Sequence, residues 1–119
     1  MTENGMSDCL FCKIATGALQ SDLVYEDDNV IAFNDINPQA PTHVLIVPKR
    51  HISTLNDLTS ADELIIGNLV RSAATIAASQ GHAENGYRTV FNCNKAAGQT
   101  VFHIHLHLLA GRRLDWPPG

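Results

Sequence analysis

Three histidines alternate with apolar residues near the end of the chain, in the run His103-Ile104-His105-Leu106-His107. A period of two is typical of a β-strand, in which successive side chains point to opposite faces. The pattern predicts that the three imidazoles project from one face, about 6.6–7 Å apart. The residues predicted to line the opposite, buried face are Phe102, Ile104, Leu106 and Leu108. An imidazole can act as a nucleophile, as an acid or base, or as a metal ligand.

Cys9 and Cys12 form a Cys-x-x-Cys pair near the start of the chain. This spacing occurs in zinc sites and in redox dithiols, and two plain reduced thiols are the third interpretation. A redox dithiol is expected between a strand and a helix, a context that this segment lacks. A zinc site needs about two more ligands. His51 and His103 are candidates, although neither is adjacent to the cysteines in sequence.

The segment from Asn92 to Thr100 is predicted to be a flexible loop that leads directly into the histidine run. Gly98 lets the backbone approach a ligand closely. The backbone N–H groups of residues 98–101 can then point at an anion beside His105. A plain turn is the alternative interpretation, because one glycine in a loop is weak evidence by itself.

Asp35 lies at the end of a predicted strand and before a loop that contains two prolines. Its carboxylate can cap a turn at Asn37, or it can accept hydrogen bonds from the hydroxyl groups of a sugar. Chemistry alone favours the turn. His43 precedes a buried strand, and its side chain can face either solvent or a site.

The periodicity of the apolar residues predicts the helices and strands that carry these side chains. A short helix is predicted from Cys9 to Ala15. A long helix is predicted to begin at a capping box of Ser60 and Glu63 and to end at Gly81. Strands are predicted at Leu23 to Tyr25, Val30 to Asn34, Val44 to Val47, Tyr87 to Asn92 and Val101 to Leu109. Five strands with one substantial helix predict an α+β domain whose sheet is largely antiparallel.

The composition indicates one small globular domain. The chain has 119 residues, of which 45% are hydrophobic, and a formal net charge of -4, which suits a single core. Residues 1–8 are small and polar and are predicted to be frayed, which leaves residues 9–119 as the domain. The sequence has no basic stripe and no long apolar stretch, so we expect no nucleic-acid or membrane partner and a cytoplasmic location. Three cysteines, an odd number, do not suggest a disulfide framework.

Several of these segments together resemble the histidine triad family. The matching segments are Phe33 to Pro38, Ala40 to Pro48, Gly86 to Arg88, Ala97 to Phe102, the run His103 to Leu109, and Trp116 to Gly119. The resemblance implies a sheet of five antiparallel strands with two helices, which dimerises into a continuous ten-stranded sheet. It also implies that the chain binds a purine nucleoside monophosphate or phosphoramidate and cleaves it at the α-phosphorus.

The resemblance further assigns roles to residues of this sequence. It implies that His105 is the nucleophile, that His107 donates to a phosphate oxygen, and that His43 belongs with these catalytic residues. Asp35 would hold the ribose hydroxyls, and Trp116 would reach the partner's site. The positions that match the base pocket are Leu10, Phe11, Leu19, Phe33 and Ile36. Those that match contacts to the phosphate and leaving group are Asn92, Gly98, Gln99, Thr100 and Val101. Cys9, Cys12, His51 and His103 resemble a structural zinc site, and no organic cofactor is implied.

The predicted function is hydrolysis of adenosine 5′-phosphoramidates and acyl-adenylates through a nucleotidyl-histidine intermediate, with release of AMP. One rival is a catalytic zinc site formed by the three histidines of the run. Another is a nucleotide-binding signalling or scaffold module with little physiological turnover. A transferase is less expected, since it would need an extra domain for its acceptor.

Overall fold

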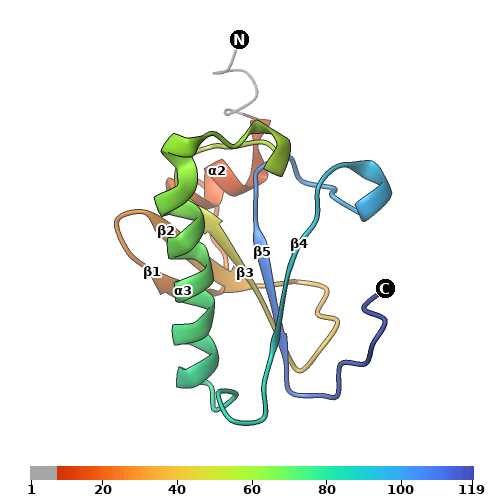
Figure 1. Cartoon of the computed structure of the whole chain (residues 1–119). Helices are drawn as coiled ribbons and strands as arrows, with labels where there is room; N and C mark the ends of the chain where they lie inside the picture. Colours follow the sequence, from red (N-terminus) through yellow and green to blue (C-terminus); the bar gives the residue numbers. More distant parts are fainter. Residues whose placement is uncertain (1–7) are drawn as a thin grey trace.

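Five antiparallel strands form one sheet in the order β1-β2-β3-β5-β4 (Figure 1). The computed structural model describes residues 8–119. The strands are β1 (Leu23–Glu26), β2 (Val30–Asn34), β3 (Thr42–Pro48), β4 (Arg88–Phe91) and β5 (Leu106–Ala110). The predicted α+β class and the antiparallel sheet are confirmed. The prediction that the first eight residues are frayed falls almost entirely outside the described residues.

The long helix α3 (Glu63–Ser79) covers one face of the sheet (Figure 1). Its Ala73 and Ala77 lie one turn apart and are fully buried, so the helix axis can approach the strands closely. The core on this face consists of Val30, Ala32, Val44, Ile46, Leu69, Ala73, Ile76, Ala77, Leu106 and Leu108. Burying each large aliphatic side chain contributes about 1.5–3 kcal/mol to folding, so α3 and the sheet stabilise each other.

The short helix α2 (Leu10–Ala15) packs on the opposite face, against the alternate residues of β2 and β3. This second cluster consists of Cys9, Phe11, Ile14, Ile31, Phe33, Leu45 and Val47. Successive residues of β2 thus enter different clusters, and both faces of the strand are covered. That arrangement explains why β2 is a continuous apolar run instead of an alternating one.

The histidine run is strand only in its second half, so the prediction of one strand from Val101 to Leu109 is wrong at its start. β5 begins at Leu106, where its ladders with β3 and β4 both end. Before that point the backbone turns away from the sheet, and the Ile104 N–H donates to the Ile52 carbonyl at 2.7 Å. Phe102 is consequently 47% exposed and is not part of the core. The other three residues predicted for the core face are buried.

The long helix ends as predicted but begins differently. The Gly81 N–H donates to Ala78 O and the His82 N–H to Ala77 O, and Gly81 has a φ of 84°. These are the bonds of a Schellman motif. The predicted capping box of Ser60 and Glu63 is wrong. Thr59 and Asp62 form the reciprocal pair around a 3₁₀ turn, Ser60–Asp62, and α3 starts after that turn.

β4 lies within the strand predicted from Tyr87 to Asn92, and it forms an edge of the sheet. Within residues 8–119, no helix has the length and apolar character needed to cross a bilayer.

Candidate active site

A cavity of about 380 Å³ opens between α2, the end of β2 and the histidine run. It is lined by ten of the residues singled out in the sequence: Leu10, Phe11, Leu19, Phe33, Asp35, Ile36, Thr100, Val101, His105 and His107. Five further residues line it that the sequence did not suggest: Ile14, Gln20, Ser21, Asn34 and Leu45. Ile14 lies three residues after Phe11, so helical periodicity could have identified it. The wall is mainly apolar, which suits a ligand that has a flat ring and carries a polar group at one end.

His105 presents one unprotonated ring nitrogen to this cavity. Its Nδ1 lies 2.8 Å from the His103 carbonyl oxygen. A carbonyl can only accept, so Nδ1 carries the proton and Nε2 keeps a free lone pair. Burial lowers the pKa of His105, and the ring is therefore neutral at pH 7. A neutral imidazole with a free Nε2 is equipped to act as a nucleophile.

His107 is held in the complementary tautomer by a chain of hydrogen bonds. The Gln39 backbone N–H donates to His43 Nδ1 at 3.0 Å, so the proton of His43 sits on Nε2. His43 Nε2 lies 2.9 Å from His107 Nδ1, which must therefore accept. The proton of His107 is left on Nε2, as a donor from a ring that lines the cavity. The buried His43 does not line the cavity itself and acts through His107.

Burial keeps these rings neutral. It lowers the pKa of His107 to about 4, with smaller contributions from His105 and His43. It also lowers the pKa of His43, although the nearby Asp35 opposes this effect. At neutral pH, His107 is thus a neutral donor.

Asp35 caps a turn and also lines the cavity. Its Oδ1 accepts from the Asn37 N–H at 2.8 Å, which confirms the predicted turn. Its Oδ2 lies 3.5 Å from His43 Nε2, too far for a strong hydrogen bond. The carboxylate lines the cavity and retains lone pairs for a ligand hydroxyl.

The loop before the histidine run is predicted to direct the backbone N–H groups of residues 98–101 at an anion, but two of these four groups are already hydrogen-bonded within the loop. Gly98 has a φ of 93°, but its N–H donates to Lys95 O and the Gln99 N–H donates to Asn94 O. A 3₁₀ turn, Lys95–Ala97, precedes Gly98, and both bonds close around it. Only Thr100 and Val101 of this predicted cradle line the cavity.

Gln99 braces the loop and does not line the cavity. Its side chain is buried, accepts from the Asn94 N–H at 2.8 Å and donates to Ser53 O at 2.8 Å. Asn92, Gly98 and Trp116 likewise do not line this cavity. Trp116 is 81% exposed. The tail that carries it is held to β4 by the Arg88 guanidinium, which donates to Leu114 O and Asp115 O at 3.2 and 2.9 Å.

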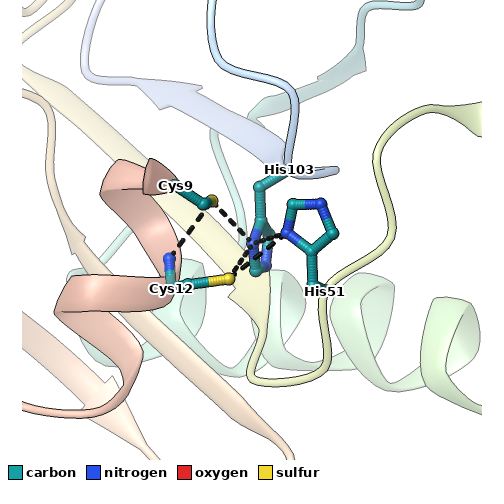
Figure 2. A group of neighbouring side chains, drawn as sticks. All are labelled: Cys9, Cys12, His51 and His103. Atoms are coloured by element: carbon teal, nitrogen blue, oxygen red, sulfur yellow. Dashed lines mark hydrogen bonds between the residues drawn. The ribbon is translucent and has the colours of Figure 1, made fainter. Parts of the chain in front are cut away.

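Cys9, Cys12, His51 and His103 converge beside the cavity, and we call these four residues the metal cluster (Figure 2). The two thiols come from α2 and its N-cap residue, and the two imidazoles come from irregular segments that face the helix. Sulfur-to-nitrogen distances are 3.2–3.4 Å, and the two Nδ1 atoms are 3.2 Å apart. Ligands at tetrahedral bond lengths of 2.0–2.3 Å would lie roughly 3.3–3.8 Å apart. The cluster therefore could hold a metal ion.

The surroundings of the metal cluster orient its ligands. His103 Nε2 lies 2.7 Å from the Pro48 carbonyl, so Nε2 carries the proton and Nδ1 faces the thiols with a free lone pair. Burial lowers the pKa of His103 to about 4, which keeps the ring neutral. The Cys12 N–H lies 3.3 Å from Cys9 Sγ. Burial, with help from Cys9, raises the pKa of Cys12 to about 12, so a bound cation is needed to make its thiolate.

A second group, Asp35, His43 and His107, also brings ligand atoms together, but its hydrogen bonds argue against a metal. His43 Nδ1 accepts from a backbone N–H, so in the neutral ring Nε2 is protonated and has no lone pair to give. The three histidines of the run are also divided between two sites. His103 faces the cysteines, whereas His105 and His107 face the cavity. This division removes the basis of the rival catalytic zinc site.

Comparison with known proteins agrees with this geometry. The HIT domain model matches residues 16–114. The chain is 50% identical over 107 residues, 90% of each protein, to the purine nucleoside phosphoramidase of Escherichia coli (strain K12).

Two solved structures have the same fold and substantial identity. A HIT family hydrolase from Legionella pneumophila superimposes with a TM-score of 0.93 at 54% identity, over 94% of this chain and 100% of that one. A histidine triad protein from Clostridium difficile superimposes with a TM-score of 0.88 at 45% identity, over 91% and 94% of the two chains. The chain belongs to the histidine triad (HIT) family.

Proposed function

We propose that this chain is a phosphoramidase, which hydrolyses purine nucleoside 5′-phosphoramidates at the α-phosphorus and releases the nucleoside monophosphate. One observation carries the proposal. The free Nε2 of a neutral, half-buried His105 opens onto a cavity with a mainly apolar wall. The 50% identity to a purine nucleoside phosphoramidase supports this choice of substrate class. Acyl-adenylates, whose α-phosphorus is attacked in the same way, are a second substrate class.

The reaction proceeds in two displacements. The His105 Nε2 lone pair attacks phosphorus, the P–N bond breaks, and the amine leaves with a proton taken from solvent. A water molecule then attacks the phosphorus of the nucleotidyl-histidine. The P–N bond to His105 breaks, the water gives up a proton, and the monophosphate departs.

His107 stabilises the charge that builds on the phosphoryl oxygens. Its Nε2–H is the donor, and Gln39 and His43 maintain that tautomer. The N–H groups of Thr100 and Val101, at the rim of the cavity, are the candidates for a second set of donors. Such preorganised donors act on the transition state without having to reorient.

The rest of the cavity binds the nucleoside. The base lies against the apolar wall that includes Phe11, Phe33 and Ile36. The carboxylate of Asp35 accepts hydrogen bonds from the ribose hydroxyls. Asn92, Gly98, Gln99 and Trp116 do not line the cavity of one chain. Gln99 shapes the loop, and the other three belong to a leaving-group region that the partner completes.

The metal cluster is a structural zinc site. Two thiolates and two imidazoles in a closed tetrahedral set are ligands that Zn²⁺ prefers, and the observed spacings fit it. A bound zinc ion would be held by Cys9, Cys12, His51 and His103, and it would stabilise the fold without supplying chemistry to the displacements. Thiol ligands of this kind persist in a reducing compartment, so we place the protein in the cytoplasm.

The functional unit is a homodimer. β4 is an edge strand, and an unpaired edge can continue a sheet into a second copy. The exposed Trp116 would then be covered by the partner and lie near its leaving-group region. Sedimentation at micromolar concentration should give the mass of a dimer, and a monomer mass contradicts this arrangement.

The proposed activity is tested by following AMP release from adenosine 5′-phosphoramidate. The parent should turn over, and His105→Asn should lose at least about 10³-fold in kcat while it remains folded. Turnover of that variant within tenfold of the parent would remove His105 from the role of nucleophile.

A further inference from the structure

Phe11 contacts an aromatic ring of the metal cluster and rings of the nucleotide cavity. Its ring centroid lies 6.1 Å from that of His103, 5.0 Å from that of His105 and 5.4 Å from that of Phe33. The interplanar angles are 70°, 90° and 68°, as in edge-to-face contacts. One side chain, 4% exposed, therefore connects a metal ligand, the proposed nucleophile and a wall of the base pocket.

The helix that carries Phe11 also carries both thiols. Cys9 is the N-cap of α2, and Cys12 is the residue after Phe11. With six residues, α2 is too short to be stable by itself. The position of α2 therefore depends on its contacts with the core and on any bond that links its two thiols to His51 and His103. Figure 2 shows those thiols directed at His51 and His103.

The nucleophile, in contrast, has anchors that do not involve the thiols. His105 is oriented by the His103 carbonyl. That segment is fixed by His103 Nε2 on Pro48 O and by the Ile104 N–H on Ile52 O, each at 2.7 Å. Loss of a metal would therefore release the base side of the cavity more than it would disturb His105.

We propose that occupancy of the metal cluster controls the affinity of the site for its nucleotide, with Phe11 as the positioning residue that transmits the effect. The inference rests on the proposed function, because it takes a purine nucleoside monophosphate as the ligand. Binding linkage makes the effect reciprocal. The factor by which bound metal lowers the Kd of the nucleotide must equal the factor by which bound nucleotide lowers the Kd of the metal.

Two titrations of the full-length chain measure this factor. Calorimetry gives the Kd of AMP for metal-free and Zn²⁺-loaded protein. Competition with a chromogenic chelator gives the Kd of Zn²⁺ with and without saturating AMP, after correction for the weak binding of Zn²⁺ to AMP alone. We expect the same factor from both, about 5- to 50-fold. In steady-state assays, metal removal should change KM by more than it changes kcat.

Two variants separate transmission from metal binding. Phe11→Leu keeps a buried apolar side chain and all four ligands. It should bind as much Zn²⁺ as the parent, while the coupling factor falls below about twofold. Cys93→Ser changes a cysteine outside the cluster and should keep the full factor.

Co²⁺-substituted protein gives a readout that needs no metal-free state. Addition of AMP should shift the visible absorption bands of Co²⁺ in the parent and in Cys93→Ser, and should leave them unchanged in Phe11→Leu.

Three outcomes would overturn the inference. The first is an AMP affinity that is the same with and without metal in folded protein. The second is a Phe11→Leu variant that keeps the full coupling factor. The third is a parent protein whose Co²⁺ absorption bands do not change when AMP is added. Each of these leaves the proposed function standing. Failure of AMP to bind even the Zn²⁺-loaded protein would overturn the proposed function, and this inference with it.

Discussion

The His103 carbonyl oxygen accepts a hydrogen bond from His105 Nδ1 at 2.8 Å, while the ring of the same His103 faces two cysteines. A candidate metal ligand thus sets the tautomer of the proposed nucleophile through its own backbone carbonyl. The ring of His103 is set in turn by the Pro48 carbonyl. Backbone groups also determine the tautomer of His107, through His43. The protonation pattern of the site is therefore built into the fold before any substrate arrives.

The backbone N–H of Gln39 can be removed to test this arrangement. Gln39→Pro deletes the donor to His43 Nδ1 but keeps the carbonyl that accepts from Arg112. His43 and then His107 can adopt the wrong tautomers. A lost hydrogen bond of about 1–1.5 kcal/mol corresponds to roughly a tenfold fall in kcat. Gln39→Ala keeps the N–H and should stay within about twofold of the parent. Equal losses in the two folded variants would show that the side chain, not the amide, matters.

Sequence periodicity could predict most of the elements, and the family resemblance pointed to much of the cavity wall. A local sequence pattern reflects which residues are buried. This explains the alternation at Leu106 and Leu108 and the spacing of Ala73 and Ala77, all of which lie in the core. The start of β5 could not be predicted, because it depends on where the ladders with β3 and β4 end.

Hydrogen bonds and contacts that depend on how the loops fold also cannot be predicted from a sequence pattern. The approach of the Gln39 N–H to His43 depends on how a proline-containing loop closes. The role of Gln99 depends on a bond to Ser53, which lies 46 residues earlier. The meeting of Cys12 with His51 was predictable as a candidate from residue types, but its geometry required the fold.

The proposed hydrogen bonds of Asp35 to the ribose can be tested with ligands that differ in their ribose hydroxyls. Leaving a bound hydroxyl without its partner costs about 1–3 kcal/mol, so Asp35→Ala should weaken AMP binding by about five- to a hundredfold. A 2′-deoxy ligand should show a smaller difference between variant and parent. Asp35→Asn keeps an oxygen for the Asn37 N–H and controls for the turn. Equal losses for both ligands would mean that Asp35 acts only through structure.

The metal cluster predicts both a stoichiometry and a stability. Protein purified without chelator should contain about one zinc per chain, because the four ligands form one closed set. Chelation, or the double change Cys9→Ser and Cys12→Ser, should lower the melting temperature, since metal affinity is linked to folding. Cys93→Ser should melt like the parent. A double variant that melts with the parent, or a substoichiometric metal content, would count against the site.

The lowered pKa of the half-buried His107 predicts how stability depends on pH. His107 has a pKa of about 4 in the folded chain, below its ordinary value of 6.5. The unfolded chain therefore binds this proton more readily, and the stability that His107 contributes is complete above pH 6.5. It is lost as the pH falls from 6.5 toward 4.

Urea denaturation at pH 7.5 and 5.0, with chelator present throughout, measures this effect. The parent should lose more free energy of unfolding between the two pH values than His107→Asn. The same loss in both proteins would show that His107 is not the group responsible.

His105 is the residue proposed to carry the nucleotide during turnover. The most direct measurement is intact-mass analysis of the protein quenched shortly after mixing with an adenosine 5′-phosphoramidate, followed by peptide mapping of the adduct. We expect a mass increase of one adenosine monophosphate unit, located on His105 and missing from His105→Asn. Turnover without an adduct at the earliest quench times, or an adduct on another residue, would contradict it.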